Sequence, residues 1–162
     1  MEFKQLLVSQ IMKQMSIFSA ILGLILGVLT IVPIIGQFAF FTLVVLATPI
    51  IFIYMKKLGM IGILDIKQGA IYGSIVGFVA FIAFCLSFLP LAVIISFISK
   101  GVHYLWAGLL VKEGFFILVM LVLFVSVLVA LMNAFSGLVT MYIYNQFERK
   151  PDESQTDISI EE

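Results

Sequence analysis

Long apolar stretches alternate with short polar clusters along the chain, and this pattern dominates the sequence. A helix needs about 20 mostly apolar residues to cross the hydrocarbon core of a bilayer. Four stretches meet this requirement, at about residues 16–33, 38–56, 68–89 and 115–144. The pattern predicts an all-α, polytopic membrane protein whose residues 1–147 form one domain with four transmembrane helices.

The residues before the first stretch show helical periodicity in place of continuous apolarity. Phe3, Leu6, Leu7 and Ile11 fall on one face of a helix, and polar residues occupy the other positions. This arrangement is typical of a helix that lies at the level of the lipid headgroups. We therefore expect a short amphipathic N-terminal helix that leads into the first span.

Prolines mark the ends and the irregular points of the predicted spans. Pro33 is expected to end the first span, because proline lacks a backbone donor and disfavours helix in the residue before it. Pro49 and Pro90 are the candidate kinks or hinges of the second and third spans. A packing bend is the alternative interpretation at Pro49. After Pro90, residues 91–110 are expected to form a separate interfacial segment.

Two octapeptides fifty positions apart share the pattern Ala-Ile-x-Gly-x-Ile-x-Gly, at residues 20–27 and 70–77. The first and third spans cross the bilayer in the same direction, so a true repeat would make the two halves parallel copies of one helix hairpin. We expect the two spans to cross through their glycine faces. A chance match between apolar strings is the alternative.

Small residues recur every four positions within these spans, which lets helices approach closely in lipid. A buried amide in a span usually bonds to a neighbouring helix, so Asn133 is predicted to hold helices together. The predicted helix-packing residues are Ser19, Gly23, Gly27, Gly69, Gly73, Gly77, Asn133 and Ser136.

Composition excludes a soluble domain. Hydrophobic residues make up 63% of the chain and charged residues 11%, and the mean hydropathy is +1.25, whereas soluble domains are roughly 45–50% apolar and about 25% charged. Acidic residues concentrate at the end of the chain, where residues 148–162 lack the apolar side chains needed for a core. This tail is predicted to be disordered and cytoplasmic.

Basic residues predict the orientation of the spans. An excess of Lys and Arg marks the cytoplasmic side of a membrane protein. With four spans both termini lie on the same side, and most basic residues fall there: Lys4, Lys13, Lys56, Lys57, Lys67, Arg149 and Lys150. The sequence therefore predicts a multi-pass protein of the cell membrane with both termini in the cytoplasm.

Aromatic residues with polar tips prefer the boundary between headgroups and hydrocarbon. They occur on both predicted boundaries and form the expected interface belt: His103, Tyr104, Trp106, Tyr142 and Tyr144. The single cysteine, Cys85, lies among apolar residues and is expected to fill space in the core.

No catalytic, cofactor-binding or metal-binding constellation is found in the sequence, and none of the predicted spans carries an ionisable residue in its central part. We therefore expect no enzyme activity, no cofactor and no nucleic-acid partner. The first hypothesis is a structural or accessory subunit that contacts the lipid bilayer and a membrane-protein partner or a second copy of itself. The alternative is a small passive or weakly coupled transporter of an apolar or zwitterionic solute.

The loop Lys56-Lys57-Leu58-Gly59 and the following stretch 62–73 show a basic inner loop that leads into a glycine-bearing third helix. In this feature, and in its charged tail, the chain loosely resembles uncharacterised bacterial four-helix inner-membrane proteins. It departs from their longer, more charged outer loop before the last helix. The resemblance implies a bacterial inner membrane and assigns no site residue.

Overall fold

The computed structural model of the chain describes residues 2–61, 65–98 and 115–148, and within these ranges it contains helices and no strands. The second span combines three segments, α2 (Pro33–Phe41), η1 (Thr42–Leu46) and α3 (Ala47–Lys57), of which η1 is a π-helix. Four helical stretches are long and apolar enough to cross a membrane. The all-α, four-span architecture is therefore confirmed. In chain order the elements are α1 (Glu2–Leu29), α2 (Pro33–Phe41), η1 (Thr42–Leu46), α3 (Ala47–Lys57), α4 (Ile66–Ile98) and α6 (Phe115–Glu148).

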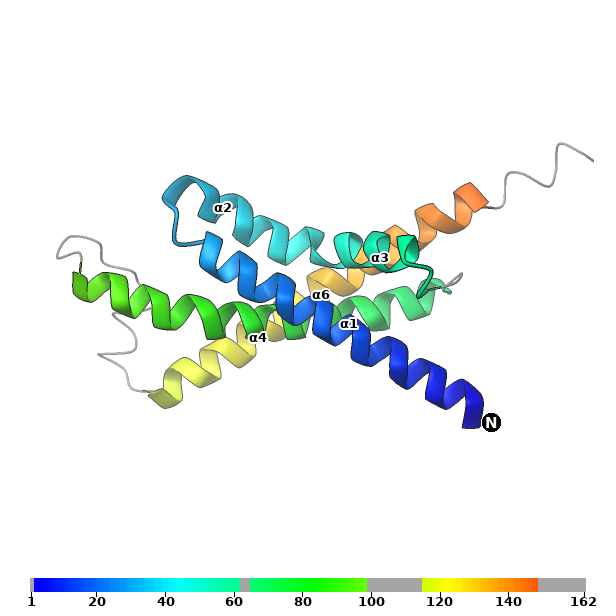
Figure 1. Ribbon diagram of the computed structural model, residues 1–162, viewed down its shortest axis with the longest axis horizontal. Helices are drawn as coiled ribbons and strands as arrows, with labels where there is room; N and C mark the ends of the chain where they lie inside the picture. Colours follow the sequence, from blue (N-terminus) through cyan, green and yellow to red (C-terminus); the bar gives the residue numbers. More distant parts are fainter. Residues whose placement is uncertain (1, 62–64, 99–114, 149–162) are drawn as a thin grey trace, which may run out of the picture.

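Helix α4 is the central element, because both α1 and α6 pack mainly against it. Figure 1 shows α1 and α6 crossing α4 with opposite slopes, and the second span lies above the crossing. Helices α1 and α4 run in one direction, and the second span and α6 run in the other. Both ends of the helical body therefore lie at the same end of the bundle.

The amphipathic N-terminal segment is not a separate element, because α1 is continuous from Glu2 to Leu29. Residues 2–22 contain neither proline nor glycine, so nothing in this stretch interrupts the helical hydrogen bonds. The segment predicted to lie in the headgroup region thus extends the first span by several turns.

The second span begins earlier than predicted, at Pro33 and not at residue 38. Proline suits the first turn of a helix, where its missing N–H would have no intrahelical partner. Val32 is extended and accepts a hydrogen bond from the Gly36 amide at 2.7 Å. A Cβ at Gly36 would collide with the Thr30 carbonyl, so glycine is required for this tight return of the chain.

The third span does not end at Pro90, because α4 continues through this proline to Ile98. Neighbouring structure in a membrane tolerates a proline that would break a helix in water. Residues 91–98 therefore belong to the span and not to a separate interfacial segment. The rest of that predicted segment, residues 99–110, and the tail after residue 148 lie outside the described residues.

The core consists of two apolar clusters at successive levels of the bundle. One, toward the end that contains the chain termini, is centred on Met15, Phe52 and Met55. The other, toward the opposite end, contains Leu43 and the phenylalanines of α4. The ring of Phe84 stacks on those of Phe81 and Phe88, with centroids 5.9 and 5.4 Å apart. Thr48 and Asn133, two buried polar residues of the spans, meet between these clusters.

Candidate functional site

Three polar side chains from two spans meet at the centre of the bundle. Thr48 is the second residue of α3, and Asn133 and Ser136 lie one turn apart on α6. Thr48 and Asn133 are fully buried. A buried polar group in lipid is costly unless it is bonded, so the partners of these side chains determine what the cluster can do.

Asn133 inserts its amide into the backbone ladder of the second span. Its Nδ2 lies 3.1 Å from the Leu43 carbonyl and 3.0 Å from the Val44 carbonyl. Its Oδ1 accepts from the Thr48 amide at 3.1 Å. In a regular α-helix that amide would donate to the Val44 carbonyl. The side chain thus replaces a backbone hydrogen bond that the π-helix and its junction with α3 leave open.

The Nδ2 group also lies 3.1 Å from the Val129 carbonyl of its own helix, so two amide hydrogens are shared among three acceptors. The Thr48 hydroxyl lies 2.9 Å from Asn133 Oδ1 and 3.3 Å from the Gly73 carbonyl. It can donate to one of them at a time. The cluster therefore connects the second, third and fourth spans.

Ser136 supplies a hydrogen bond that Pro49 cannot make. Proline has no N–H, so the Val45 carbonyl four residues earlier loses its helical partner. Ser136 Oγ donates to that carbonyl at 2.7 Å. Asn133 and Ser136 together supply the bonds that η1 and Pro49 remove. Every buried side-chain nitrogen or oxygen in the described part of the chain has a hydrogen-bond partner.

The glycines of α4 bring the third and fourth spans into backbone contact around this cluster. A Cβ at Gly73 would collide with the Asn133 carbonyl, and one at Gly77 would lie 2.6 Å from Asn133 Cβ. Gly69 and Gly137 face each other at the same crossing. Larger residues would push α6 away from α4, so these glycines set the distance over which Asn133 reaches the second span.

The glycines of α1 face α4 but not its glycines. A Cβ at Gly23 would collide with the backbone of Ala80, and one at Gly27 with the Ser87 hydroxyl. Ser87 Oγ lies 3.1 Å from the Leu24 carbonyl of α1 and 3.0 Å from a carbonyl of its own helix. The expectation that the two glycine ladders cross each other is therefore wrong, because the α4 ladder is covered by α6.

Other predicted residues lie at the edges of this arrangement. Ser19 is fully buried and donates to the Met15 carbonyl of its own helix at 2.6 Å. Near the end of α6, Lys56 Nζ lies over the ring of Tyr144, 4.1 Å from its centroid, in a cation–π contact. Tyr142 is half exposed. The remaining belt residues, His103, Tyr104 and Trp106, lie outside the described residues.

Sequence reasoning missed the π-helix and the apolar cavity beside Pro90. The π-helix has no composition signal of its own, although Pro49 indicated an irregularity nearby. The cavity, of about 630 Å³, lies between the second half of α4 and the first turns of α6. Cys85 lines it, so this side chain borders open space in addition to packing in the core.

The arrangement can bond and align helices, but it offers no polar surface to a solute. Thr48 and Asn133 bond to each other and to backbone groups, and Ser136 bonds to the Val45 carbonyl, while Ser87 lies apart, at the contact of α1 with α4. Among the residues that the structure describes, no three His, Cys, Asp or Glu side chains approach closely enough to hold a metal ion. Comparison of the chain with family models, with curated proteins and with solved structures finds no match.

Proposed function

We propose that this integral membrane protein is a structural or accessory subunit of a membrane complex, with no catalytic role. The observation that carries the proposal is the use of the polar side chains in the spans. Asn133, Thr48 and Ser136 are engaged with the backbones of neighbouring helices. Such a network stabilises one arrangement of helices, which is what an interaction surface in a membrane requires.

Helix α6 offers the longest surface to a partner. Phe124, Leu131 and Phe135 lie on its outer side and are each more than 60% exposed. In a membrane this surface faces lipid or another helix. A partner subunit or a second copy of the chain would pack here without displacing any described helix.

Photocrosslinking from this surface tests the proposal. A photoreactive amino acid replaces Leu131 in the full chain, in its native membrane, and the matched control replaces Ile21 on α1, which is 48% exposed. We expect one crosslinked protein species of defined mass from position 131. Crosslinks to lipid alone at both positions would contradict an accessory role.

The alternative function is a small passive or weakly coupled transporter. The apolar cavity between α4 and α6 favours an apolar solute over a zwitterionic one, since its lining offers no charged side chain. Uptake of labelled solutes into vesicles that contain the purified protein distinguishes the two functions. Uptake above that of empty vesicles, without any protein crosslink, would favour transport.

The orientation is part of the same proposal, with both termini on the cytoplasmic side of a bacterial inner membrane. Its basis is the excess of basic residues at the end of the bundle that holds the Lys56-Lys57 pair. In a Cys85→Ala background, we expect Leu58→Cys to react with an impermeant maleimide only from the cytoplasm, and Gln37→Cys only from outside. Both residues are exposed, at opposite ends of the second span. The reverse labelling pattern would invert the topology.

A further inference from the structure

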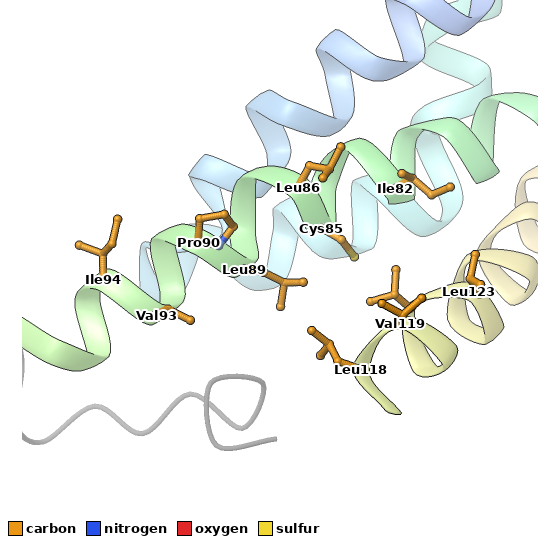
Figure 2. A pocket seen from close by; sticks show the side chains of 11 residues that line it. Ile82, Cys85, Leu86, Leu89, Pro90, Val93, Ile94, Leu118, Val119 and Leu123 are labelled. Carbon is orange, nitrogen blue, oxygen red and sulfur yellow. The ribbon is translucent and has the colours of Figure 1, made fainter. Parts of the chain in front are cut away.

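The cavity beside Pro90 is a groove between two apolar stripes. Residues of α4 spaced by three or four positions form one wall, and the first turns of α6 form the other. Figure 2 shows Cys85 and Leu89 pointing across the gap toward Leu118 and Val119. The described residues that line it are Ile82, Cys85, Leu86, Leu89, Pro90, Val93, Ile94, Leu118, Val119, Val122 and Leu123.

The groove exists because α4 and α6 touch at one level and diverge at another. They are in backbone contact at the glycines of α4, which face Asn133 and Gly137. Beyond that crossing the two helices separate toward the end of the bundle that holds the second half of α4 (Figure 1). Side chains of ordinary size do not close the gap, and a volume of about 630 Å³ remains.

The lining determines the chemistry of what can fill this volume. Among the residues that the structure describes, no carboxylate, amine, hydroxyl or amide side chain contributes to it, and the thiol of Cys85 is only a weak donor. A water molecule needs two to four polar partners to be stable in a cavity, whereas apolar cavities stay dry and bind apolar molecules. The chemistry therefore favours a hydrocarbon group.

The length of the groove suits an extended chain. From Ile82 to Ile94 the groove runs about 18 Å along α4 at 1.5 Å per residue. An extended polymethylene chain that lies along this length contacts both apolar walls.

The groove opens toward the region that lipid occupies. Both of its helices are membrane spans. The residues at its rim include Leu86, Ile94 and Leu123, which are 69%, 52% and 43% exposed. In a bilayer these residues face hydrocarbon, so a chain can enter sideways from the membrane without crossing water.

A smaller cavity of about 90 Å³ lies deeper, against the stacked rings of Phe81, Phe84 and Phe88. Cys85, Leu89 and Val122 border both cavities and form the partition between them. A rotamer change in these side chains would extend the groove toward the aromatic rings.

From this placement we propose that the groove between α4 and α6 is a binding site for the hydrocarbon chain of a membrane lipid. The chain lies along the Cys85, Leu89 and Val122 wall and is held by apolar contact alone. This site is independent of the accessory role proposed above, since α6 presents its outer surface to a partner and its inner surface to the groove.

The test uses the full chain in mild detergent, titrated with a phospholipid that carries a diazirine in its acyl chain. After illumination, mass spectrometry locates the crosslinked residues. We expect adducts on Leu89 and Val122 to reach a maximum at a low ratio of lipid to protein, because the groove holds a limited number of chains, while adducts on the outer residue Leu131 keep rising with this ratio. Groove adducts that rise in proportion to those on Leu131 would overturn the proposal.

Variants provide the second measurement. Val122→Trp fills the groove, and Val127→Trp adds the same ring on the outer face of α6, where Val127 is 51% exposed. Displacing about two methylene groups from the groove weakens chain binding by about tenfold, so V122W should lose most groove adducts and V127W should keep them. Alkylation of the single cysteine by an apolar maleimide should slow when lipid chains fill the groove.

An unreactive Cys85 in lipid-depleted detergent, together with no adduct on either wall, would mean that protein fills the groove, and this outcome also overturns the proposal. If V122W does not fold, the titration of the natural chain with the labelled phospholipid still decides. If no lipid chain binds in the groove, the proposed accessory role is unaffected, because the crosslinks from Leu131 to a protein partner are measured separately.

Discussion

The two prolines inside the spans lie in opposite surroundings. Just before Pro49 the helix widens into η1, and the Val45 carbonyl that loses its partner accepts a hydrogen bond from Ser136. At Pro90, α4 keeps its α-helical form, and the described residues that line the adjacent groove are apolar. The same residue type therefore produces a polar junction in one span and the wall of an apolar groove in another.

The difference lies in what the facing helix presents. Near Pro49, α6 offers Asn133 and Ser136, which bond to the opened backbone. Near Pro90, α6 offers Leu118 and Val122, which cannot. Helix α6 thus has a bonded half and an open half. We expect substitutions in the bonded half, around Asn133 and Ser136, to cost stability. Substitutions in the open half, around Leu118 and Val122, should change what binds in the groove.

The largest effect should come from Asn133→Leu, which keeps the approximate shape and removes the amide. Four bonds to the second span disappear, and each intramembrane hydrogen bond contributes about 0.6 kcal/mol on average. The opened backbone groups are left buried without partners, at about 1–3 kcal/mol each. We expect a loss of about 2–4 kcal/mol, or a Tm lowered by about 5–15 °C in mild detergent.

Asn145→Leu is the matched control, because Asn145 lies about three turns further along α6, beyond the polar cluster. It should change Tm by less than about 2 °C, in the range of a substitution away from the core. Equal losses for the two variants would mean that the cluster is not the stabilising junction that the comparison requires.

Gly73→Ala should have the next largest effect, because it separates the helices that the cluster joins. Its Cβ would collide with the Asn133 carbonyl, and overpacking of this kind costs about 1–3 kcal/mol. The loss should appear even though alanine is the better helix former by about 1 kcal/mol. Val127→Ile adds the same single carbon on the exposed side of α6, and its Tm should stay unchanged in the same thermal unfolding assay.

The proline pair tests the comparison directly. Pro90→Ala restores an N–H that can bond to the Leu86 carbonyl, and we expect it to raise stability by about 1–2 kcal/mol, or Tm by about 2–6 °C. Pro49→Ala should gain little, because the Val45 carbonyl already accepts from Ser136. Equal gains at both positions would show that the Ser136 bond does not compensate for the missing amide.

Much of this fold could be predicted from the sequence, since spans follow directly from apolar length. The role of Asn133 in holding helices together could be predicted, because an amide among apolar residues in a span usually forms hydrogen bonds to a neighbouring helix. The small residues that permit close approach were also recognisable, but their partners were not. Gly73 packs on α6 and not on the similar ladder of α1, because spacing along one helix does not say which helix covers it.

The bonding pattern at Pro49 could not be predicted, because it depends on distances between residues about ninety positions apart. Nothing in the local sequence indicates that the helix widens at Thr42–Leu46. The end of the third span was misjudged for a related reason. A proline breaks a helix when water competes for the backbone, and this competition is absent within a span, so α4 continues through Pro90.

The smallest effect should come from Ser136→Ala, which removes one hydrogen bond to the Val45 carbonyl. We expect a loss of about 0.6–1 kcal/mol, or about 1–4 °C in Tm. Ser74→Ala is the control, because the Ser74 hydroxyl donates within its own turn, to the Ile71 carbonyl. In a Pro49→Ala background the new amide can take over the Val45 carbonyl, so Ser136→Ala should cost less there than in the natural chain. If the effects of the two mutations simply add in this double-mutant cycle, the Ser136 hydroxyl does not stand in for the missing amide of Pro49. The two positions are expected to be coupled because both would donate to the Val45 carbonyl.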